Sequence, residues 1–350
     1  MAQAGGFELQ TLDTSIMYAD GNAASISIAD INASVDGTAN GEKVDTVKDQ
    51  KVTNIGFKMD AGLVDVGLYT YRSGAIQLSG GNTLGGNYAP QGDVDINSTT
   101  LMIKYDVNEN VSLLGGITQN NLTSGNVTTI KGSYDIDSAS STGYVVGAAY
   151  AIPEIALRAE VLYQPKSKIT TKTNYDATGG VYNAAALLVN GEKETELSRP
   201  ETLTLNVQSG IAENTLMFAS YHRSKWSGAP VVVDIEPAMG GAVDPKIDET
   251  FDDSEKFTIG VGRKFSDKLS GSLSYSKEDG SGANAESLFT FSNGTETISA
   301  GLRYTIDNMD ISVGVSRSRL GDVAVDGGAG DIVYEGNSVT AMGVKIAFAF

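Results

Sequence analysis

His222 is the only histidine of this 350-residue chain, and it stands two residues from both Ser220 and Ser224. A serine hydrogen-bonded to a histidine forms the nucleophile and base of many hydrolases. On a strand, side chains two residues apart share one face, so this spacing permits the contact. A single exposed polar residue is the commoner arrangement, and we predict no catalytic residue and no enzymatic activity.

Other residue types exclude several further classes of chemistry. Asp244, Asp248, Asp252 and Asp253 form an acidic run. They lack the Gly and terminal Glu spacing of an EF-hand loop, so we expect a solvated loop and no metal site. The absence of cysteine excludes disulfides and Cys-type zinc sites, and without a G-x-x-x-x-G-K-[ST] loop we expect no cofactor. The net charge of −18 argues against nucleic acid as a partner.

The hydropathy of the chain restricts the elements that could position these residues. No stretch reaches the ~18 consecutive apolar residues that a membrane helix needs. A strand of a membrane barrel needs only ~9–11 residues with apolar side chains at alternate positions. Forty-one glycines and fifteen tyrosines are typical of a strand-rich chain with many turns.

Period-two alternation recurs along the whole chain and is clearest near its end. Met309, Ile311, Val313 and Val315 alternate with small or polar residues, and only Asp307 and Asn308 separate this strand from the one before it. The segments with such alternation are 23–34, 51–60, 62–74, 98–106, 110–122, 141–151, 154–168, 199–211, 214–226, 255–265, 268–277, 296–306, 309–319 and 338–350.

The connections between these fourteen segments alternate strictly between short and long. Outer-membrane barrels have short periplasmic turns and long external loops, and an even strand number leaves both termini on the periplasmic side. A soluble β-sandwich, the main alternative, predicts mixed loop lengths. We therefore predict an all-β protein, a transmembrane antiparallel barrel of about fourteen strands.

In a membrane barrel the apolar face meets lipid and the polar face lines the lumen. Alternation then points a set of charged side chains inward, with small side chains such as those of Ser270 and Ser272 around them. The cations among them are our candidate ligand-binding residues: Lys104, Arg158, Arg303, Lys58 and Lys264. The same rule turns Glu160 and Lys345 inward.

Residues 1–22 precede the first strand and carry many apolar groups. Exposing these groups to water would be unfavourable, so we predict a plug inside the lumen at 1–22 and a barrel at 23–350. A disordered tail or an extra strand are the alternatives. Met1-Ala2-Gln3-Ala4 is typical of the remnant left after signal-peptide cleavage. The apolar plug residues are Phe7, Leu9, Leu12, Ile16, Met17 and Tyr18.

Three places in the sequence resemble the FadL-type outer-membrane transporters of long-chain fatty acids and hydrophobic compounds. They are Gly6-Phe7-Glu8-Leu9 with Ser15 to Asn22, the stretch from Arg199-Pro200-Glu201-Thr202 to Trp226-Ser227, and the terminal Phe350, which resembles the signal read by the outer-membrane assembly machinery. The resemblance implies a fourteen-stranded barrel with an N-terminal hatch, and passive uptake with sideways exit of ligand through the wall. The longer hatch of the family, with its Asn-Pro-Ala segment, is missing here.

We therefore expect a passive channel in the bacterial outer membrane for hydrophobic or amphipathic molecules such as long-chain fatty acids. Burial gains ~0.8 kcal/mol per methylene, and a lumenal cation would pair the carboxylate. A water-filled porin for small polar solutes is the main alternative, and a surface adhesin is a third. The partners we expect are the ligand, outer-membrane lipids and lipopolysaccharide, and the chain should be a monomer.

The resemblance also implies a gap where an early strand kinks inward. The third predicted strand carries Gly67 between Val66 and Leu68, and glycine inside a strand often marks a bend. We therefore place the lateral opening at Gly67. The alternative is that this glycine only leaves room for a neighbouring side chain.

Overall fold

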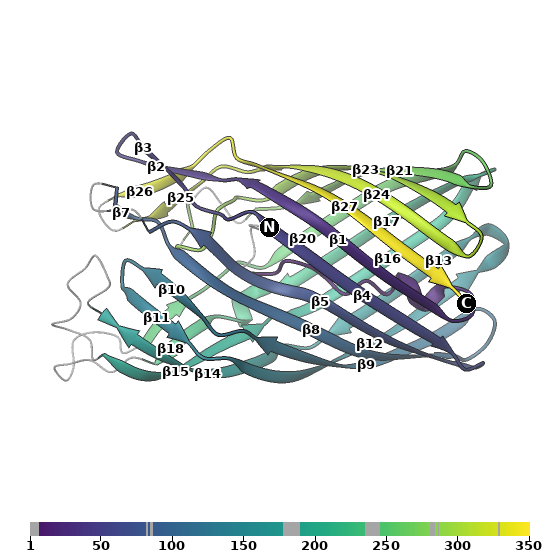
Figure 1. The fold of residues 1–350 in the computed structure, drawn as a ribbon, viewed down its shortest axis with the longest axis horizontal. Coiled ribbons are helices and arrows are strands. Elements are labelled where there is room, and N and C mark those ends of the chain that lie inside the picture. Colours follow the sequence, from purple (N-terminus) through teal and green to yellow (C-terminus); the bar gives the residue numbers. More distant parts are fainter. Residues whose placement is uncertain are drawn as a thin grey trace.

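A single closed barrel dominates the computed structural model, which describes residues 7–81, 83–84, 87–177, 190–234, 246–280, 284–285, 287–327 and 330–350 (Figure 1). Within these residues, fourteen antiparallel strands pair in sequence order, and β1 closes the ring on β27. They are β1 (Ala23–Ser34), β4 (Gln50–Asp60), β5 (Val64–Ser79), β8 (Gln91–Asp106), β9 (Val111–Leu122), β12 (Ala139–Ile152), β13 (Leu157–Gln164), β16 (Glu201–Ala212), β17 (Thr215–Lys225), β20 (Ser254–Lys264), β21 (Leu269–Glu278), β23 (Thr295–Ile306), β24 (Met309–Leu320) and β27 (Ser338–Ala349). The predicted fold class is confirmed.

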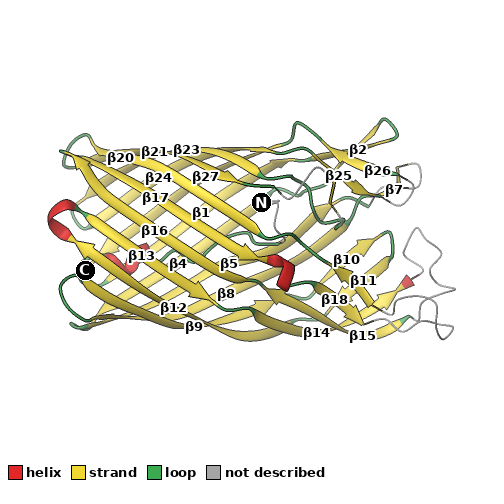
Figure 2. Cartoon of the chain, turned by 180° about the vertical axis from the view of Figure 1, so that it is seen from behind, coloured by secondary structure: helices red, strands yellow, loops and turns green. Residues whose placement is uncertain are grey.

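Tight turns join the strands at one end of the barrel, the turn end, and longer connections join them at the other, the loop end. Further short strands lie within these connections: hairpins in three of them continue the sheet of the wall beyond the barrel, and the other strands form two separate small sheets (Figures 1 and 2). These short strands are β2 (Asp36–Ala39), β3 (Glu42–Asp45), β6 (Thr83–Leu84), β7 (Asn87–Tyr88), β10 (Gly125–Thr129), β11 (Gly132–Ile136), β14 (Ser167–Asp176), β15 (Gly191–Arg199), β18 (Val231–Asp234), β19 (Lys246–Glu249), β22 (Asn284–Ala285), β25 (Val323–Asp326) and β26 (Asp331–Tyr334). The sequence-based prediction had treated these segments as loops.

Two barrel strands are longer than alternation predicted. β5 continues to Ser79, and β8 begins at Gln91 instead of residue 98. A β-bulge between Arg72 and Gly74 shifts the register of their ladder, which then continues to the pair Ser79–Gln91. Such a bulge changes which residues share a face, so the apolar period is interrupted there and is hard to read from sequence.

The outer face of the barrel is an apolar belt. Among the described residues, the large apolar side chains that stay well exposed lie on the fourteen strands or their short turns. Examples are Ile298, Leu302, Val313, Val344 and Phe348. A face of this kind is what a barrel presents to lipid. Within the same residues, no helix is long and apolar enough to cross a membrane.

The N-terminal segment, residues 7–22, lies inside the barrel. Its short 3-10 helix η1 (Ser15–Tyr18) buries Ile16 and Met17 against inward side chains of the wall, including Tyr69 and Met102. Met17 is fully buried. The described part of residues 1–22 thus lies where the plug is predicted, while Met1 to Gly6 lie outside the described residues.

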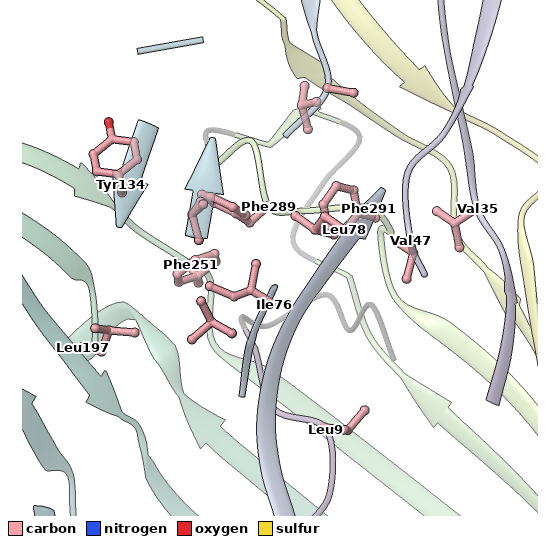
Figure 3. Close-up of a cluster of buried hydrophobic side chains, with 14 of the residues drawn as sticks. Leu9, Val35, Val47, Ile76, Leu78, Tyr134, Leu197, Phe251, Phe289 and Phe291 are labelled. Atoms are coloured by element: carbon pink, nitrogen blue, oxygen red, sulfur yellow. The ribbon is translucent and has the colours of Figure 1, made fainter. Parts of the chain in front are cut away.

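A second apolar core fills the loop end of the barrel. It joins residues that are distant in sequence, among them Leu9, Ile76, Leu197, Phe251 and Phe289 (Figure 3). The hairpin strands around it alternate buried and exposed residues, as in β14 and β15. The loop end is thus a packed layer with an apolar interior.

Candidate functional site

The N-terminal segment crosses the lumen from wall to wall near its beginning. The Leu9 N–H donates to the Ser73 carbonyl on β5 at 3.0 Å. The adjacent Glu8 carboxylate accepts from Ser224 Oγ at 2.8 Å and lies 3.2 Å from Nε2 of His222, both on β17. β5 and β17 are the third and ninth of the fourteen strands, so these contacts join nearly opposite walls.

The segment crosses the lumen again closer to the turn end. Thr14 Oγ1 and the Tyr18 hydroxyl donate to the Glu160 carboxylate on β13 at 2.8 and 2.5 Å. Asp13 pairs with Lys345 on β27 at 3.2 Å. These are the seventh and fourteenth strands, again on opposite sides. Two crossings divide the lumen into compartments.

The compartment on the loop-end side is a small apolar pocket, which we call the loop-end pocket. Its volume is about 50 Å³. Phe7 from the N-terminal segment forms part of its wall, and the other lining residues are Ile76, Val127, Thr129, Tyr134, Ile136, Thr173, Thr195, Leu197, Val231, Val233, Glu249 and Phe289. Its lining side chains come from six of the loop-end hairpin strands, from β5, from the N-terminal segment and from the connection after β21.

On the turn-end side of the first crossing lies a larger and more polar cavity, which we call the lumen cavity. It measures about 490 Å³. Its charged lining residues are Glu8, Asp13, Arg158, Glu160, Lys256 and Glu278. Four carboxylates against two fixed cations and His222, which is paired with Glu8, give this cavity an acidic balance. Glu8 and Phe7 are neighbours in the chain, so the N-terminal segment presents an acid to one compartment and an aromatic ring to the other.

The ladder of the wall is broken between β4 and β5, and we call this the wall break. Pairing between the two strands ends at Ile55 and Thr70, although both strands continue toward the loop end. The next contact beyond it is the Lys48 N–H donating to the Gln77 carbonyl. Between these points the Ser73 carbonyl accepts from the N-terminal segment, which here occupies the place of β4 as a partner of β5.

Several buried polar atoms beside the wall break have no hydrogen-bond partner. They are Gln10 Oε1, Gln50 Oε1, Asn54 Oδ1, Tyr69 OH and Tyr71 OH. Buried polar groups in native proteins are nearly always paired with protein or water, so such a concentration calls for an explanation. A passage that holds water or a ligand beside the N-terminal segment would provide the partners.

Several solved structures share the architecture of this chain. A Pseudomonas aeruginosa FadL homologue matches with a TM-score of 0.78 at 12% identity over 99% of this chain and 100% of that one. The Pseudomonas putida toluene transporter TodX gives 0.68 at 12% identity, over 96% and 92% of the two chains. The Ralstonia pickettii toluene transporter TbuX gives 0.65 at 13% identity, over 100% and 97%.

The chain has the FadL-type barrel fold. The sequence itself matches no protein-family model and no curated protein. Structural likeness at identities this low shows a common fold alone, so the activity of this FadL-type barrel is argued below from its own residues.

The predicted lumenal cations of the FadL-type barrel are inward, and two of them are buried in ion pairs within the wall. Lys58 and Lys104 are buried and both bind Asp65, at 3.0 and 2.7 Å, and Lys104 also binds Asp106 at 2.8 Å. Lys58 additionally donates to the carbonyl of Ala19 on the N-terminal segment. Paired in this way, they hold the wall and the plug together.

The other predicted cations lie in two places. Arg158 lines the lumen cavity, with its guanidinium 4.1 Å from the centre of the Tyr18 ring. Lys264, Arg303 and Lys345 line a recess at the turn end, where Lys264 pairs with Asp267 and Arg303 lies 3.7 Å from Asp310. The candidate set is therefore distributed along the lumen and does not form one anion site.

Gly67, the predicted lateral opening, lies in continuous wall. It pairs with Lys58 of β4 and with Met102 of β8. An added Cβ would lie 2.4 Å from the sulfur of Met17, so this glycine gives room to η1. The surroundings of Gly67 therefore fit the alternative, that this glycine only leaves room for a neighbouring side chain. The break in pairing lies beyond Thr70.

His222 does not form a catalytic triad with its neighbours. Nε2 lies 3.0 Å from Ser224 Oγ and 3.2 Å from Glu8, while Nδ1 faces the Thr204 hydroxyl at 2.8 Å. In a triad the acid orients the imidazole through the nitrogen opposite the serine. Here acid and serine share one nitrogen, and Ser224 is fully buried. These contacts attach the N-terminal segment to the wall.

Sequence reasoning missed three residues with functional positions. Lys256 lines the lumen cavity by the same alternation rule that selected the other cations. Glu8 and Glu249 had no signal, because their partners come from distant elements.

In the acidic run, Asp244 lies outside the described residues, and Asp253 accepts from Ser227. Among the residues that the structure describes, no group of His, Cys, Asp and Glu is arranged to hold a metal ion.

Proposed function

We propose that this protein is a passive channel of the bacterial outer membrane that takes up hydrophobic molecules. The observation that carries the proposal is the position of the N-terminal segment, which separates an apolar pocket from a polar cavity and borders an unpaired stretch of wall. The apolar outer belt supports the membrane location. The fold is shared with a FadL homologue and with two proteins described as toluene transporters.

Uptake of this kind needs no energy source. A hydrophobic molecule that leaves water for an apolar pocket gains ~0.8 kcal/mol per buried methylene. The loop end, with its long connections, faces the exterior in barrels of this class, so the loop-end pocket is the first apolar site that such a molecule meets. The barrel is proposed to act as a monomer surrounded by lipids and lipopolysaccharide.

The exit proposed here is the wall break between β4 and β5. Straight passage would carry an apolar ligand through the lumen cavity, whose lining includes Glu160 and Glu278, both buried carboxylates. A sideways route leads to the hydrocarbon phase. The unpaired backbone of β5 would be costly in lipid, and the N-terminal segment satisfies part of it through Ser73 and Ala75.

Two ligand classes fit this proposal: long-chain fatty acids and uncharged hydrocarbons. A fatty acid carboxylate would need a cation, and Arg158 and Lys256 line the lumen cavity. The carboxylates around them, however, outnumber the cations. Because like charges repel strongly where water is scarce, this balance favours uncharged ligands.

Removing the β-bulge tests the exit. In a Ser73 deletion, β5 gains the regular register that would allow it to pair with β4 along its length. Uptake of toluene into cells that produce this variant should fall while binding to the purified protein persists. Ser73→Ala keeps the bulge and serves as the matched control. Unchanged uptake by the deletion variant would rule out this route.

The alternative is a water-filled porin for small polar solutes. The polar, small-residue lining of the lumen cavity favours it. The two crossings of the lumen by residues 8–18 oppose it, because they obstruct a straight aqueous path. Single-channel conductance in planar bilayers separates the two functions: a steady open pore in the complete protein would support the porin.

A further inference from the structure

The ring of Phe7 sits in an aromatic box at the edge of the loop-end pocket. Its centroid lies 4.8 Å from that of Phe251, 5.5 Å from that of Phe289 and 6.3 Å from that of Trp226, with edge-to-face ring angles of 72 to 88°. Such geometry is the favoured one for aromatic pairs. The box is therefore shaped for a single six-membered aromatic ring.

Phe7 belongs to the N-terminal segment, which is bound to the barrel wall but is not one of its strands. Backbone hydrogen bonds to Ser73 and Ala75 and the side-chain contacts of Glu8 hold this part of it. The pocket beside Phe7 has about 50 Å³, well under the ~150 Å³ of a dry cavity known to bind benzene. A ligand ring would therefore have to take the place of the Phe7 ring.

One carboxyl group interrupts the apolar lining of the loop-end pocket. Glu249 is 8% exposed, accepts from Ser287 Oγ at 2.9 Å and lies 3.6 Å from Nζ of Lys131. Burial raises the pKa of the Glu249 carboxyl, and Lys131 and Ser287 offset only part of that effect. The Leu288 N–H is a third partner, and the three leave acceptor capacity on the carboxyl oxygens, which have about four lone-pair positions.

Three hydroxyl groups in the same lining are unpartnered, those of Thr173, Thr195 and Tyr134. Thr173 and Thr195 are each 1% exposed, and neither Oγ1 has a hydrogen-bond partner. A buried hydroxyl without a partner costs free energy that a bound polar group would recover. Together with Glu249 they give the pocket acceptors for one donor and no fixed cation among its lining residues.

We propose that the loop-end pocket selects single-ring aromatic compounds that carry one O–H or N–H donor, the ring replacing that of Phe7 and the donor turning to Glu249 and the threonine hydroxyls. The inference rests on the proposed function and narrows its ligand class. Aromatic and aliphatic carboxylates are disfavoured, because their charge would meet that of Glu249 in a nearly dry pocket. Plain hydrocarbons fit the box but leave the threonine hydroxyls unpaired.

Trp226 provides the measurement, because it is the only tryptophan of the chain and borders the box. Its fluorescence in the detergent-solubilised protein would be titrated with benzyl alcohol, toluene and benzoate, three ligands with one ring each. We expect benzyl alcohol and toluene to change the emission and benzoate to bind far more weakly. Tight binding of benzoate would overturn the proposal.

The decisive quantity is the ratio of the benzyl alcohol and toluene dissociation constants in matched variants. Glu249→Met should weaken benzyl alcohol binding roughly tenfold, the effect of one lost hydrogen bond to a charged group, and leave toluene unchanged. Thr195→Val, which keeps the shape of the side chain, should shift the ratio in the same direction. Glu278→Gln is the control, because that buried carboxyl lines the other cavity.

The outcomes separate the inference from the proposed function. Equal loss of both ligands in Glu249→Met, together with an unchanged ratio in Thr195→Val, would show that Glu249 only joins the hairpins and that water satisfies the hydroxyls. The inference would then be wrong, and uptake of toluene by intact cells would still support the channel. If neither ligand changed the emission and cells took up no hydrophobic compound, the proposed function itself would be wrong.

Discussion

Oε2 of Glu8 and Nε2 of His222 lie 3.2 Å apart, although 214 residues separate them in the sequence. Together with the Ser224 hydroxyl at 2.8 Å, this contact fastens the N-terminal segment to β17 at the boundary between the two compartments. It fixes the same stretch of the segment that pairs with β5 at the wall break. The first prediction concerns its strength.

Lowering the pH should weaken the attachment of the N-terminal segment to the barrel wall. Burial acts to raise the pKa of the Glu8 carboxyl, but the charge of His222 and the hydrogen bonds from His222 and Ser224 outweigh it and hold the pKa below its ordinary value of 4.5. A carboxyl of this kind stabilises the folded arrangement above its unfolded pKa and ceases to do so as the pH falls through its folded pKa.

The measurement is hydrogen exchange of residues 7–19 as a function of pH. Protection should be full at neutral pH and decline below the ordinary value of 4.5, while Glu8→Gln should lower it at neutral pH by the equivalent of roughly 1–3 kcal/mol and remove the further decline in acid. Equal protection of the variant and the unmodified protein would show that the apolar contacts of η1 alone retain the segment.

Asp65 should be the most sensitive charged residue of the barrel wall. Its two carboxylate oxygens bind the buried Lys58 and Lys104, so Asp65→Asn leaves two buried cations without their shared partner. Breaking a buried pair costs ~3–5 kcal/mol, and the temperature at which the barrel loses its folded band on gels should drop clearly. Lys264→Gln, at the half-exposed pair with Asp267, should have almost no effect.

Removal of the N-terminal segment should convert the protein into an open pore. A chain without residues 2–18 loses both crossings, including the contacts of Thr14 and Tyr18 with Glu160. Planar bilayers should then show stable conductance steps that the complete protein lacks. A deletion variant that stays closed would mean that the loop-end core by itself seals the lumen.

Loss of Phe350 should impair assembly while leaving the ligand sites untouched. Its side chain is 64% exposed on the outer face, and its backbone exchanges two hydrogen bonds with Asn22. Deleting it should leave misassembled protein in the periplasm, as measured by fractionation of the envelope. Normal amounts of the deletion variant in the outer membrane would show that assembly reads another feature.

The strands, their faces and the alternation of short and long connections followed from the sequence by itself. Met309, Ile311, Val313 and Val315 alternate with residues of the opposite face, and that period is a local property of extended backbone. The inward direction of Lys58 and Arg158 follows from the same rule, and so does the outward direction of Phe348. Each needs only the parity of its own strand.

Which of these residues contact one another was decided only by the tertiary structure. The sequence around Ser73 does not indicate the β-bulge found there. The position of the wall break depends on where the N-terminal segment takes the place of β4 as the partner of β5. Glu249 and Thr195 face one pocket because separate hairpins fold over the same end of the barrel. Contacts across a lumen depend on strand number, register and closure of the whole ring, and a short sequence window contains none of these.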